Sequence, residues 1–395
     1  MAVISIQNLD VVFGDNQAAT LSLMDQGKNR EQILGETGDV VGVQNATIEV
    51  NEGEICVLMG LSGSGKSTLL RTLNGLNKVA RGKCLVRDGD EMVDMATCNE
   101  ATMRHMRTHR VSMVFQSFAL MPWLTVLENV AFGLEMQGMA KAERLEKAMQ
   151  QLKMVSLDQW ADKKPDELSG GMRQRVGLAR AFAMDTDVLL MDEPFSALDP
   201  LIRTQLQDEL IELQKTLNKT IVFVSHDLDE ALKIGTKIAI MESANIIQED
   251  IPEQIVLNPA TPYVEKFVAH TNPLNVLKGD SLMTPIEKLQ NESGTYQAEK
   301  GLNFALSAEG KLESVDSTEG SHLVVDWAQG LEINKLALGS VVLAPSDINM
   351  RDAVEVRYQT QQPLLLQKEG SVVGVLGDHD FYHALLGKHF SSNDS

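Results

Sequence analysis

The chain has 395 residues, and its 35 basic against 55 acidic residues give a formal net charge of -20 at pH 7. That length predicts two domains, and the acidic balance opposes nonspecific binding to nucleic acid or to an anionic lipid surface. Cys56, Cys84 and Cys98 form no CxxC pair, so we expect core or neutral surface thiols in a reducing compartment. We expect neither a transmembrane helix nor a signal peptide, because no apolar run approaches about 18 residues and residues 1–12 lack a basic region.

The first part of the chain predicts two strands separated by a polar insertion. Residues 3–13 alternate enough to form a strand, and residues 40–50 resemble another. The polar stretch between them covers residues 17–39. It contains a short helix at 30–34, which we expect Gly35 to end.

Residues 60–68, Gly-Leu-Ser-Gly-Ser-Gly-Lys-Ser-Thr, fit the phosphate-binding pattern G-x-x-x-x-G-K-[ST]. The apolar run 55–59 before them predicts a buried strand, and residues 67–73 predict the start of a helix. Glycines let backbone N–H groups converge, the helix N-terminus adds its positive dipole end, and Lys66 brings a charge for the phosphates. A Gly/Ser linker is the alternative, but a linker has no reason to carry Lys-Ser-Thr-Leu-Leu after a buried strand. The residues expected to hold nucleotide phosphates here are Gly60, Ser62, Gly63, Ser64, Gly65, Lys66, Ser67 and Thr68.

Later strands deliver polar side chains at their ends. Apolar runs at 111–115, 188–191 and 221–224 predict buried strands. Open parallel sheets bind ligands at the carboxyl ends of their strands, so the residues at these ends are site candidates. They are Gln116, Asp192, Glu193 and His226.

Helical patterns fill the intervals between these strands. Residues 125–128 form a capping box, and 140–155 are typical of a surface helix, so we expect a helical insertion before Ser169. Ser169 is suited to be the N-cap of the next helix, and a further helix runs from Pro200 to Asn218. Strands that alternate with helices in this way predict a doubly wound α/β layer.

The pattern changes from about residue 272. Short weak strands replace the α/β alternation, and residues 271–395 hold 9 basic against 17 acidic side chains, which predicts a separate acidic appendage. His379 and His383, with Asp380 and His389 nearby, could suggest a metal site. A solvated helix end is the better interpretation, and we assign no ligand there.

Taken together, these motifs make residues 1 to about 270 resemble the nucleotide-binding subunit of ATP-binding cassette (ABC) transporters. The most specific part is the signature stretch 168–175, Leu-Ser-Gly-Gly-Met-Arg-Gln-Arg, which separates this family from other phosphate-loop ATPases. The resemblance implies an α/β phosphate-loop NTPase cassette over residues 1–271, with a mixed sheet core and a helical subdomain at about 117–185. A smaller α+β accessory or regulatory domain, partly CBS-like, would follow at 272–395.

The resemblance also implies ATP and Mg²⁺ as cofactors and gives each polar residue a role. Ser67, Gln116 and Asp192 would hold the metal, as hard oxygen ligands suit Mg²⁺. Glu193 would orient and polarise the attacking water, and His226 would reach the γ-phosphate. Phe13 would stack on adenine.

The signature segment implies a homodimer. In the family it meets the γ-phosphate bound to a partner subunit, so two chains would sandwich two ATP molecules head to tail. The residues implied on this side of the nucleotide are Ser169, Gly170, Gly171 and Asp199.

The aromatic and Met-rich segment 115–124 would accept a coupling helix from transmembrane permease subunits; the alternative is that its side chains are core of the helical insertion. A periplasmic or extracellular substrate-binding protein would be an indirect partner, and no nucleic acid is expected. The subunit would then be a peripheral protein on the cytoplasmic face of the cell membrane, held by the permease.

The insertion 17–39 and the runs 115–122 and 199–204 are similar to importers of quaternary amines such as glycine betaine, proline betaine and choline. Residues 353–386 partly resemble a CBS module, whereas 273–340 match one poorly, and this divergent tail favours choline-type importers. The resemblance therefore implies the ATP-hydrolysing subunit of such an importer.

Two other functions fit the sequence less well. A soluble ABC-type ATPase acting on chromosomes or ribosomes is disfavoured by the single cassette, by the interval of about a hundred residues between phosphate loop and signature, and by the acidic charge. A regulatory dimer that binds nucleotide without turnover is disfavoured by the presence of Glu193.

Overall fold

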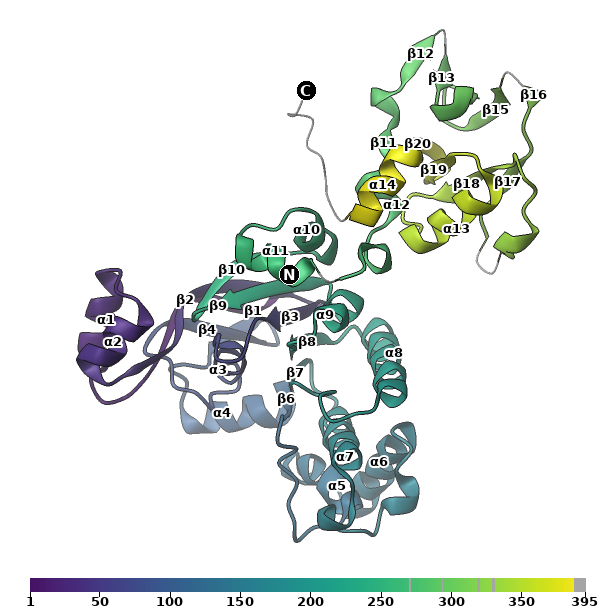
Figure 1. Ribbon diagram of the computed structural model, residues 1–395. Coiled ribbons are helices and arrows are strands. Elements are labelled where there is room, and N and C mark those ends of the chain that lie inside the picture. Colours follow the sequence, from purple (N-terminus) through teal and green to yellow (C-terminus); the bar gives the residue numbers. More distant parts are fainter. Residues whose placement is uncertain (270, 293, 318–319, 329–330, 387–395) are drawn as a thin grey trace. The chain divides into compact units, whose positions relative to one another are not determined.

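The computed structural model describes residues 1–269, 271–292, 294–317, 320–328 and 331–386. They belong to two compact units, Met1–Ile251 and Pro252–Ser395 (Figure 1). This division lies before residue 272, where the composition changes. The reason is that Leu257 packs in the core of the second unit, and Glu253 pairs with Lys278 at 3.2 Å. The domain limits 1–271 and 272–395 remain predictions.

The first unit contains an antiparallel sheet with the strand order β2-β1-β4-β5. Its strands are β1 (Ala2–Phe13), β2 (Val40–Asn51), β4 (Arg81–Asp88) and β5 (Glu91–Asp94). In the register of the central pairs, Ile4 lies opposite Val50 on one side and Val86 on the other. The two expected strands at 3–13 and 40–50 are therefore neighbours, and Phe13 stands at the end of the first.

A six-stranded sheet with the order β10-β9-β3-β8-β7-β6 forms the centre of this unit. Strands β6, β7, β8, β3 and β9 run parallel, and β10 is antiparallel to β9. Every residue of β3, β7 and β8 is buried, which agrees with the apolar runs that make up most of their sequences. The strands are β3 (Ile55–Met59), β6 (Val111–Val114), β7 (Val188–Asp192), β8 (Thr220–Val224), β9 (Lys237–Glu242) and β10 (Asn245–Asp250).

Helices occupy the intervals where the sequence predicts them. The capping box at Thr125 is present, since the Glu128 amide donates to Thr125 Oγ1 at 3.1 Å. Asn218 ends the Pro200 helix in the left-handed conformation, with φ of 51°. The helices are α3 (Lys66–Leu70), α4 (Glu100–His105), α5 (Val126–Met136), α6 (Lys141–Met154), α7 (Gly170–Ala183), α8 (Pro200–Leu217) and α9 (Leu228–Ile234), with a π-helical segment at Met106–Arg110 and 3₁₀ turns at Asp158–Trp160 and Pro165–Glu167.

The polar insertion between β1 and β2 is more helical than the sequence suggests. It holds α1 (Gln17–Asp25) and α2 (Arg30–Thr37), so the prediction that Gly35 ends the helix was wrong. Helix α2 is stabilised at its start by a capping box of Asn29 and Gln32, and it continues through Gly35. Its left-handed C-cap is Gly38, with φ of 74°.

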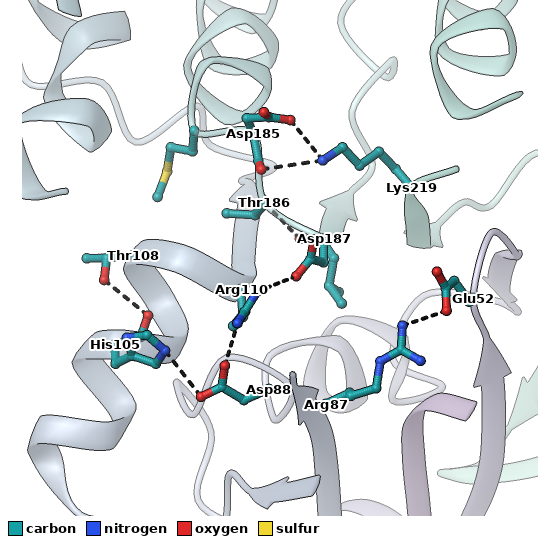
Figure 2. A network of polar contacts seen from close by, with 12 residues as sticks. Glu52, Arg87, Asp88, His105, Thr108, Arg110, Asp185, Thr186, Asp187 and Lys219 are labelled. Atoms are coloured by element: carbon teal, nitrogen blue, oxygen red, sulfur yellow. Dashed lines mark hydrogen bonds and ion pairs between the residues drawn. The ribbon is translucent and has the colours of Figure 1, made fainter. Parts of the chain in front are cut away.

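Ion pairs fasten the amino ends of the central strands (Figure 2). Arg110, directly before β6, bonds to Asp88 at 2.5 Å and to Asp187, directly before β7, at 2.9 Å. Lys219, directly before β8, pairs with Asp185 at 2.8 Å. We call this network the amino-edge pairs; it fixes one edge of the sheet by charge.

The second unit is built on a five-stranded sheet with the order β11-β20-β19-β18-β17. One core joins this sheet to α13 and α14, and another joins it to an antiparallel sheet with the order β12-β13-β14-β15-β16. The expected order of strands and helix over 353–386 is present, in a unit of mixed α and β structure. The strands are β11 (Thr284–Pro285), β12 (Gln290–Glu292), β13 (Thr295–Gln297), β14 (Asn303–Leu306), β15 (Leu312–Ser317), β16 (Gly320–Ser321), β17 (Val324–Asp326), β18 (Val341–Pro345), β19 (Leu364–Lys368) and β20 (Ser371–Leu376); the helices are α10 (Pro252–Leu257), α11 (Pro262–Val268), α12 (Gly279–Leu282), α13 (Met350–Thr360) and α14 (Asp378–Leu386), with 3₁₀ turns at Pro273–Asn275, Ile286–Lys288, Glu299–Gly301 and Ile333–Lys335.

Helix α14 is less solvated than its histidines suggest. His383 is buried, and its ring lies 4.1 Å from that of His379 between centroids. Asp380 is buried too, and burial raises the pKa of its carboxyl to about 6. Among the described residues no three His, Cys, Asp or Glu side chains are grouped to hold a metal, and His389 lies outside those residues. No helix in the described ranges has the length and apolar character that a membrane span needs.

Candidate active site

The predicted phosphate loop joins β3 to α3 and is folded tightly at its base. Gly60 and Gly65 have φ of 142° and 105°, which only glycine adopts easily. A Cβ atom on Gly60 would come within 2.1 Å of the Met241 carbonyl oxygen, and one on Gly65 within 2.5 Å of the Gly42 carbonyl oxygen. The glycines of the motif are therefore required by close backbone contacts as well as by conformation.

The tip of the loop is open. Ser62 and Gly63 are exposed, and a Cβ atom on Gly63 would meet nothing within 4 Å. Ser64 is buried, yet its hydroxyl has no hydrogen-bond partner among the described residues. A buried hydroxyl without a partner is costly, so it marks a place where a bound group can supply one.

Lys66 is folded into this loop. Its side chain is buried, and Nζ donates hydrogen bonds to the carbonyl oxygens of Gly60 at 2.8 Å and Leu61 at 2.9 Å. Burial lowers the pKa of the ammonium group, and the nearby carboxylates of Glu193 and Asp192 oppose that shift. The loop thus holds a positive charge whose direct partners are neutral oxygens.

Ser67 and Asp192 meet at the foot of the loop. The fully buried Asp192 carboxylate accepts a hydrogen bond from Ser67 Oγ at 2.7 Å and pairs with Arg71 at 2.9 Å. A protein usually contributes only a few hard oxygen ligands to Mg²⁺, such as a hydroxyl and a carboxylate that lie in contact. The ion takes its other ligands from phosphates and water. The donor set therefore fits this ion.

Glu193 brings three strand ends together. Its φ of 49° is unusual for a residue with a side chain, and its amide donates to the Val224 carbonyl oxygen at 3.1 Å. One carboxylate oxygen lies 3.5 Å from His226 Nδ1, and the other accepts a hydrogen bond from Gln116 Nε2 at 3.1 Å. Backbone strain of this kind often accompanies a functional site. Gln116 thus contacts Glu193 through its amide nitrogen.

His226 is held in place by its neighbours in the chain. The Asp227 amide donates to Ser225 Oγ at 3.0 Å, and that hydroxyl donates to the Glu230 carboxylate at 2.5 Å. Burial raises the pKa of Glu230, although Ser225 and Gln207 oppose the shift through hydrogen bonds. These hydrogen bonds fix the turn after β8, while the His226 side chain remains 62% exposed and accessible to a bound group.

Sequence reasoning missed Gln174, which touches the backbone of Glu193. Gln174 is 1% exposed on α7; its Nε2 donates to the Glu193 carbonyl oxygen at 3.2 Å, and its Oε1 accepts from the Ala197 amide at 3.1 Å. An amide side chain inside the signature stretch was the available signal, but only the fold shows what it contacts.

Phe13 lies beside the phosphate loop. A Cβ atom on Gly42 would come within 2.7 Å of the Phe13 ring and 2.9 Å of Thr68 Cγ2, so ring and loop helix share the space that this glycine leaves. Phe13 is 44% exposed. A flat ring with an open face beside the first turn of the loop helix suits stacking by a planar base.

The signature turn faces open space. Ser169 caps α7 by accepting a hydrogen bond from the Met172 amide at 3.3 Å, as predicted. A Cβ atom on Gly170 would meet nothing within 4 Å, whereas one on Gly171 would lie 3.3 Å from the Ala197 carbonyl oxygen. Asp199 caps α8 through the Ile202 amide at 3.1 Å. The Cβ position of Gly170 is thus more than 4 Å from any atom of the phosphate loop of its own chain.

An apolar cleft of about 360 Å³ lies next to Gln116 and is lined from both the sheet and the helical insertion. Arg180 shapes its mouth by donating to the carbonyl oxygens of Phe118 at 2.9 Å and Ala119 at 2.6 Å, two residues with positive φ. Trp123, on the same segment, is 70% exposed. The apolar lining of the cleft includes Met113, Phe115, Met121, Phe132, Met136 and Met184.

Comparison with known proteins gives related results at three levels. The family model described as ABC transporter matches residues 43–196. The glycine betaine/proline betaine transport system ATP-binding protein ProV of Salmonella typhimurium is 44% identical over 83% of this chain and 84% of its own length. The glycine betaine/carnitine transport ATP-binding protein GbuA of Listeria monocytogenes is 38% identical over 100% of both chains. A solved dimeric ATP-binding cassette in a post-hydrolysis state, bound to ADP and Pi, is 29% identical with a TM-score of 0.55, covering 63% of this chain and 98% of that one.

Proposed function

Because the chain belongs to the ATP-binding subunits of ABC transporters, we propose that it binds and hydrolyses ATP to power an importer of quaternary ammonium compounds such as choline or glycine betaine. The observation that carries the proposal is the meeting of Lys66, the Ser67–Asp192 pair and Glu193 at the carboxyl edge of one sheet. The substrate class is supported by the relatives, which are glycine betaine transport proteins. Those relatives also disfavour a soluble ATPase without a transport partner.

The phosphate loop would hold the nucleotide. Its amides and Lys66 offset the negative charge of the phosphates, the partnerless Ser64 hydroxyl supplies a further polar contact, and Phe13 stacks on the base. The residues assigned to this part are Phe13, Gly60, Ser62, Gly63, Ser64, Gly65, Lys66, Ser67 and Thr68.

Ser67 and Asp192 would hold Mg²⁺. When bound, this ion neutralises charge that develops on the phosphate oxygens. The Gln116 amide nitrogen is engaged by Glu193, so its oxygen is the atom that can turn towards the metal as a third ligand.

Glu193 would act as general base: its carboxylate orients the attacking water and accepts its proton. The hydrogen bond from Gln116 and the nearby His226 fix the carboxylate, and the exposed His226 reaches the γ-phosphate. The strained backbone at Glu193 keeps this geometry before nucleotide arrives.

Two copies of the chain would complete the site. The open turn of Ser169, Gly170 and Gly171 is a helix N-terminus suited to an anion, and we assign it, with Asp199, to the nucleotide held by the partner copy. ATP then favours the closed homodimer because it makes contacts in that state alone, and hydrolysis removes them.

The apolar cleft beside Gln116 would receive the permease. Its Met-rich and aromatic lining, with the exposed Trp123 nearby, suits the apolar face of a helix. Docking there holds the subunit peripherally at the cytoplasmic face of the membrane, and a substrate-binding protein acts indirectly. Any nucleotide-driven change at Gln116 is next to the docked helix, which couples hydrolysis to transport.

The proposal is tested with Lys66→Ala in the full chain, measured by titration of a fluorescent ATP analogue and by phosphate release. We expect both to be lost, because the loop then has no ammonium for the phosphates. Lys147→Ala is the control, since Lys147 is a half-exposed residue on α6 in a weak pair with Glu143 at 3.9 Å. Equal ATP affinity in the two variants would contradict the assignment of the loop. Binding of choline, glycine betaine and carnitine to the copurified transporter tests the substrate class, and binding of none would contradict it.

A further inference from the structure

The insertion of α1 and α2, at one end of β2 in Figure 1, is firmly anchored at its base. Asp39 is 2% exposed; its carboxylate accepts hydrogen bonds from Thr20 Oγ1 at 2.9 Å and from the Asn16 amide at 3.1 Å. At the other end of α1, Asp25 pairs with Arg81 of β4 at 2.8 Å. The two helices therefore form a fixed projection beside the nucleotide site.

The apolar side of the insertion leads to the phosphate loop. Met24 and Ile33 pack in a small core that also contains Ala244, from the turn between β9 and β10. The Ala244 amide donates to the Ser64 carbonyl oxygen at 3.1 Å. The back of the phosphate loop is thus supported by a residue against which the insertion packs.

The polar side of the insertion reaches the front of the same loop. Arg30 is the first residue of α2, where the capping box at Asn29 fixes the helix start. Its guanidinium donates to the Gly63 carbonyl oxygen at 3.0 Å. Gly63 has a φ of 78° and no neighbour within 4 Å of a Cβ position, so the loop tip has little other support on that side.

The charge of Arg30 is also distinctive. The other cation at this end of the insertion, Lys28, is paired with Glu36 at 2.6 Å. Within the described parts of the chain, no ion pair involves Arg30. Its positive charge therefore lies beside the anion cradle with a neutral carbonyl as partner. That carbonyl belongs to the same peptide unit as the Ser64 amide, which donates to the Leu61 carbonyl oxygen at 3.2 Å. A cation on the oxygen polarises this N–H and so strengthens the turn at the loop tip.

We propose that Arg30 is a positioning residue for nucleotide binding, by which the insertion holds the tip of the phosphate loop in its anion-binding conformation. The inference rests on the proposed function of that loop. It assigns a role to a segment, residues 17–39, that the assignments of phosphate, metal and base contacts leave unused. Arg30 acts through the Gly63–Ser64 peptide, so ligands that occupy the loop should depend on it and ligands that bind only through the base should not.

The test compares Arg30→Ala with Lys28→Ala in the full chain by titration with fluorescent ATP and ADP analogues and with adenosine. Both variants remove one positive charge from the same segment, but only Arg30 touches the loop. We expect Arg30→Ala to raise the Kd for ATP and ADP about three- to tenfold, as for loss of one typical hydrogen bond, and to leave adenosine binding unchanged. Arg30→Lys should recover part of the loss, and the effect should persist at high salt, which screens exposed charges.

Three results would overturn the proposal. Equal Kd values for Arg30→Ala and Lys28→Ala would show that only the net charge of the insertion matters. A loss of ATP affinity that disappears at high salt would also show that only the net charge of the insertion matters. An equal loss for adenosine would show that the variant disturbs the whole site. The proposed function fails in a different way, since then the parent chain and Lys66→Ala would bind ATP equally.

Discussion

The two edges of the six-stranded sheet use charge differently. At the amino edge, the amino-edge pairs join Arg110 to Asp88 and Asp187, and Lys219 to Asp185 (Figure 2). At the carboxyl edge, the Lys66 ammonium bonds to carbonyl oxygens although carboxylates are near. Charges at the first edge are matched with each other. At the second edge Asp192 is paired with Arg71, but the Lys66 ammonium is left able to bind something else.

Hydrogen bonding differs in the same direction. At the carboxyl edge, the buried Ser64 hydroxyl lacks a partner among the described residues. A left-handed φ occurs at both edges, 49° at Glu193 and 51° at Asp185. The same strands run from one edge to the other, and β7 and β8 are buried along their whole length, so the difference does not come from packing. It indicates that an unmet hydrogen bond marks the reactive edge, and that paired charges mark the structural one. Substitutions at the two edges should therefore change different measurements.

The largest effect is expected for Glu193→Gln. Removing the base should lower the phosphate release rate by on the order of 10² to 10⁴ while ATP affinity remains near the parental value, because the loop is unchanged. Single-turnover phosphate release and equilibrium ATP titration measure the two quantities. Turnover at the parental rate would contradict the assignment of the base and remove the functional difference between the edges.

A smaller loss is expected for Gln174→Met, which keeps the side-chain length but removes both hydrogen bonds to the Glu193 and Ala197 backbones. Without them Glu193 is less well placed, so kcat should fall on the order of ten- to a hundredfold with KM for ATP little changed. Gln174→Glu can accept from Ala197 but cannot donate to Glu193, and should not restore the rate. A change in KM alone would argue against positioning.

Phe13→Ala should act on binding alone. Loss of a stacking ring should raise the Kd for ATP about five- to tenfold, and Phe13→Tyr should keep the parental affinity. Isothermal titration of each variant with ATP measures this. An unchanged affinity for ATP in Phe13→Ala would show that adenine binds elsewhere. The carboxyl edge would then contact only the phosphates.

The smallest effect is expected for Arg110→Met at the amino edge. We expect a loss of about 1 kcal/mol in the free energy of unfolding, because the pairs are partly exposed, and no change in phosphate release. Urea denaturation and single-turnover rates measure the two. A large loss of turnover would contradict the separation of the two edges.

The effect of Arg110→Met on the free energy of unfolding should depend on pH. Burial raises the pKa of the Asp88 carboxyl, but hydrogen bonds from Arg110 and His105 outweigh burial and hold that pKa below 3.8. A lowered folded pKa contributes stability that is present above the unfolded pKa and is lost as pH falls through the folded one. The difference in unfolding free energy between parent and Arg110→Met should therefore narrow below about pH 4. A constant difference at all pH values would contradict this pairing.

Much of the reactive edge could be predicted because its residues follow buried strands in fixed patterns. Asp192 and Glu193 end an unbroken apolar run, and Ser169 precedes a periodic helix, so local sequence was enough. Gln174 and Arg30 escaped prediction because each acts through a backbone carbonyl distant in the sequence, and such contacts leave no local pattern.

Other misses have similar causes. Gly35 was expected to end a helix, but it lies inside α2, and the left-handed residue that ends the helix is Gly38. The π-helical turn at Met106–Arg110, which sets Arg110 between two carboxylates, also leaves no mark in the sequence. His383 was expected at a solvated helix end, but it is buried. Its burial depends on elements elsewhere in the chain that pack against the helix. Patterns along the chain thus predict strand ends and caps, while contacts across the fold need the structure.

The central claim is that two copies of this chain close on ATP, with the loop of one facing the signature turn of the other. The most direct measurement is the mass of Glu193→Gln in solution by light scattering, with and without ATP and Mg²⁺, with Lys66→Ala as the variant that cannot bind. The account predicts twice the mass of one chain when Glu193→Gln is saturated with ATP, and a single chain for Lys66→Ala. A Glu193→Gln chain that is saturated with ATP yet keeps the mass of one chain, even with its membrane partners present, would contradict it.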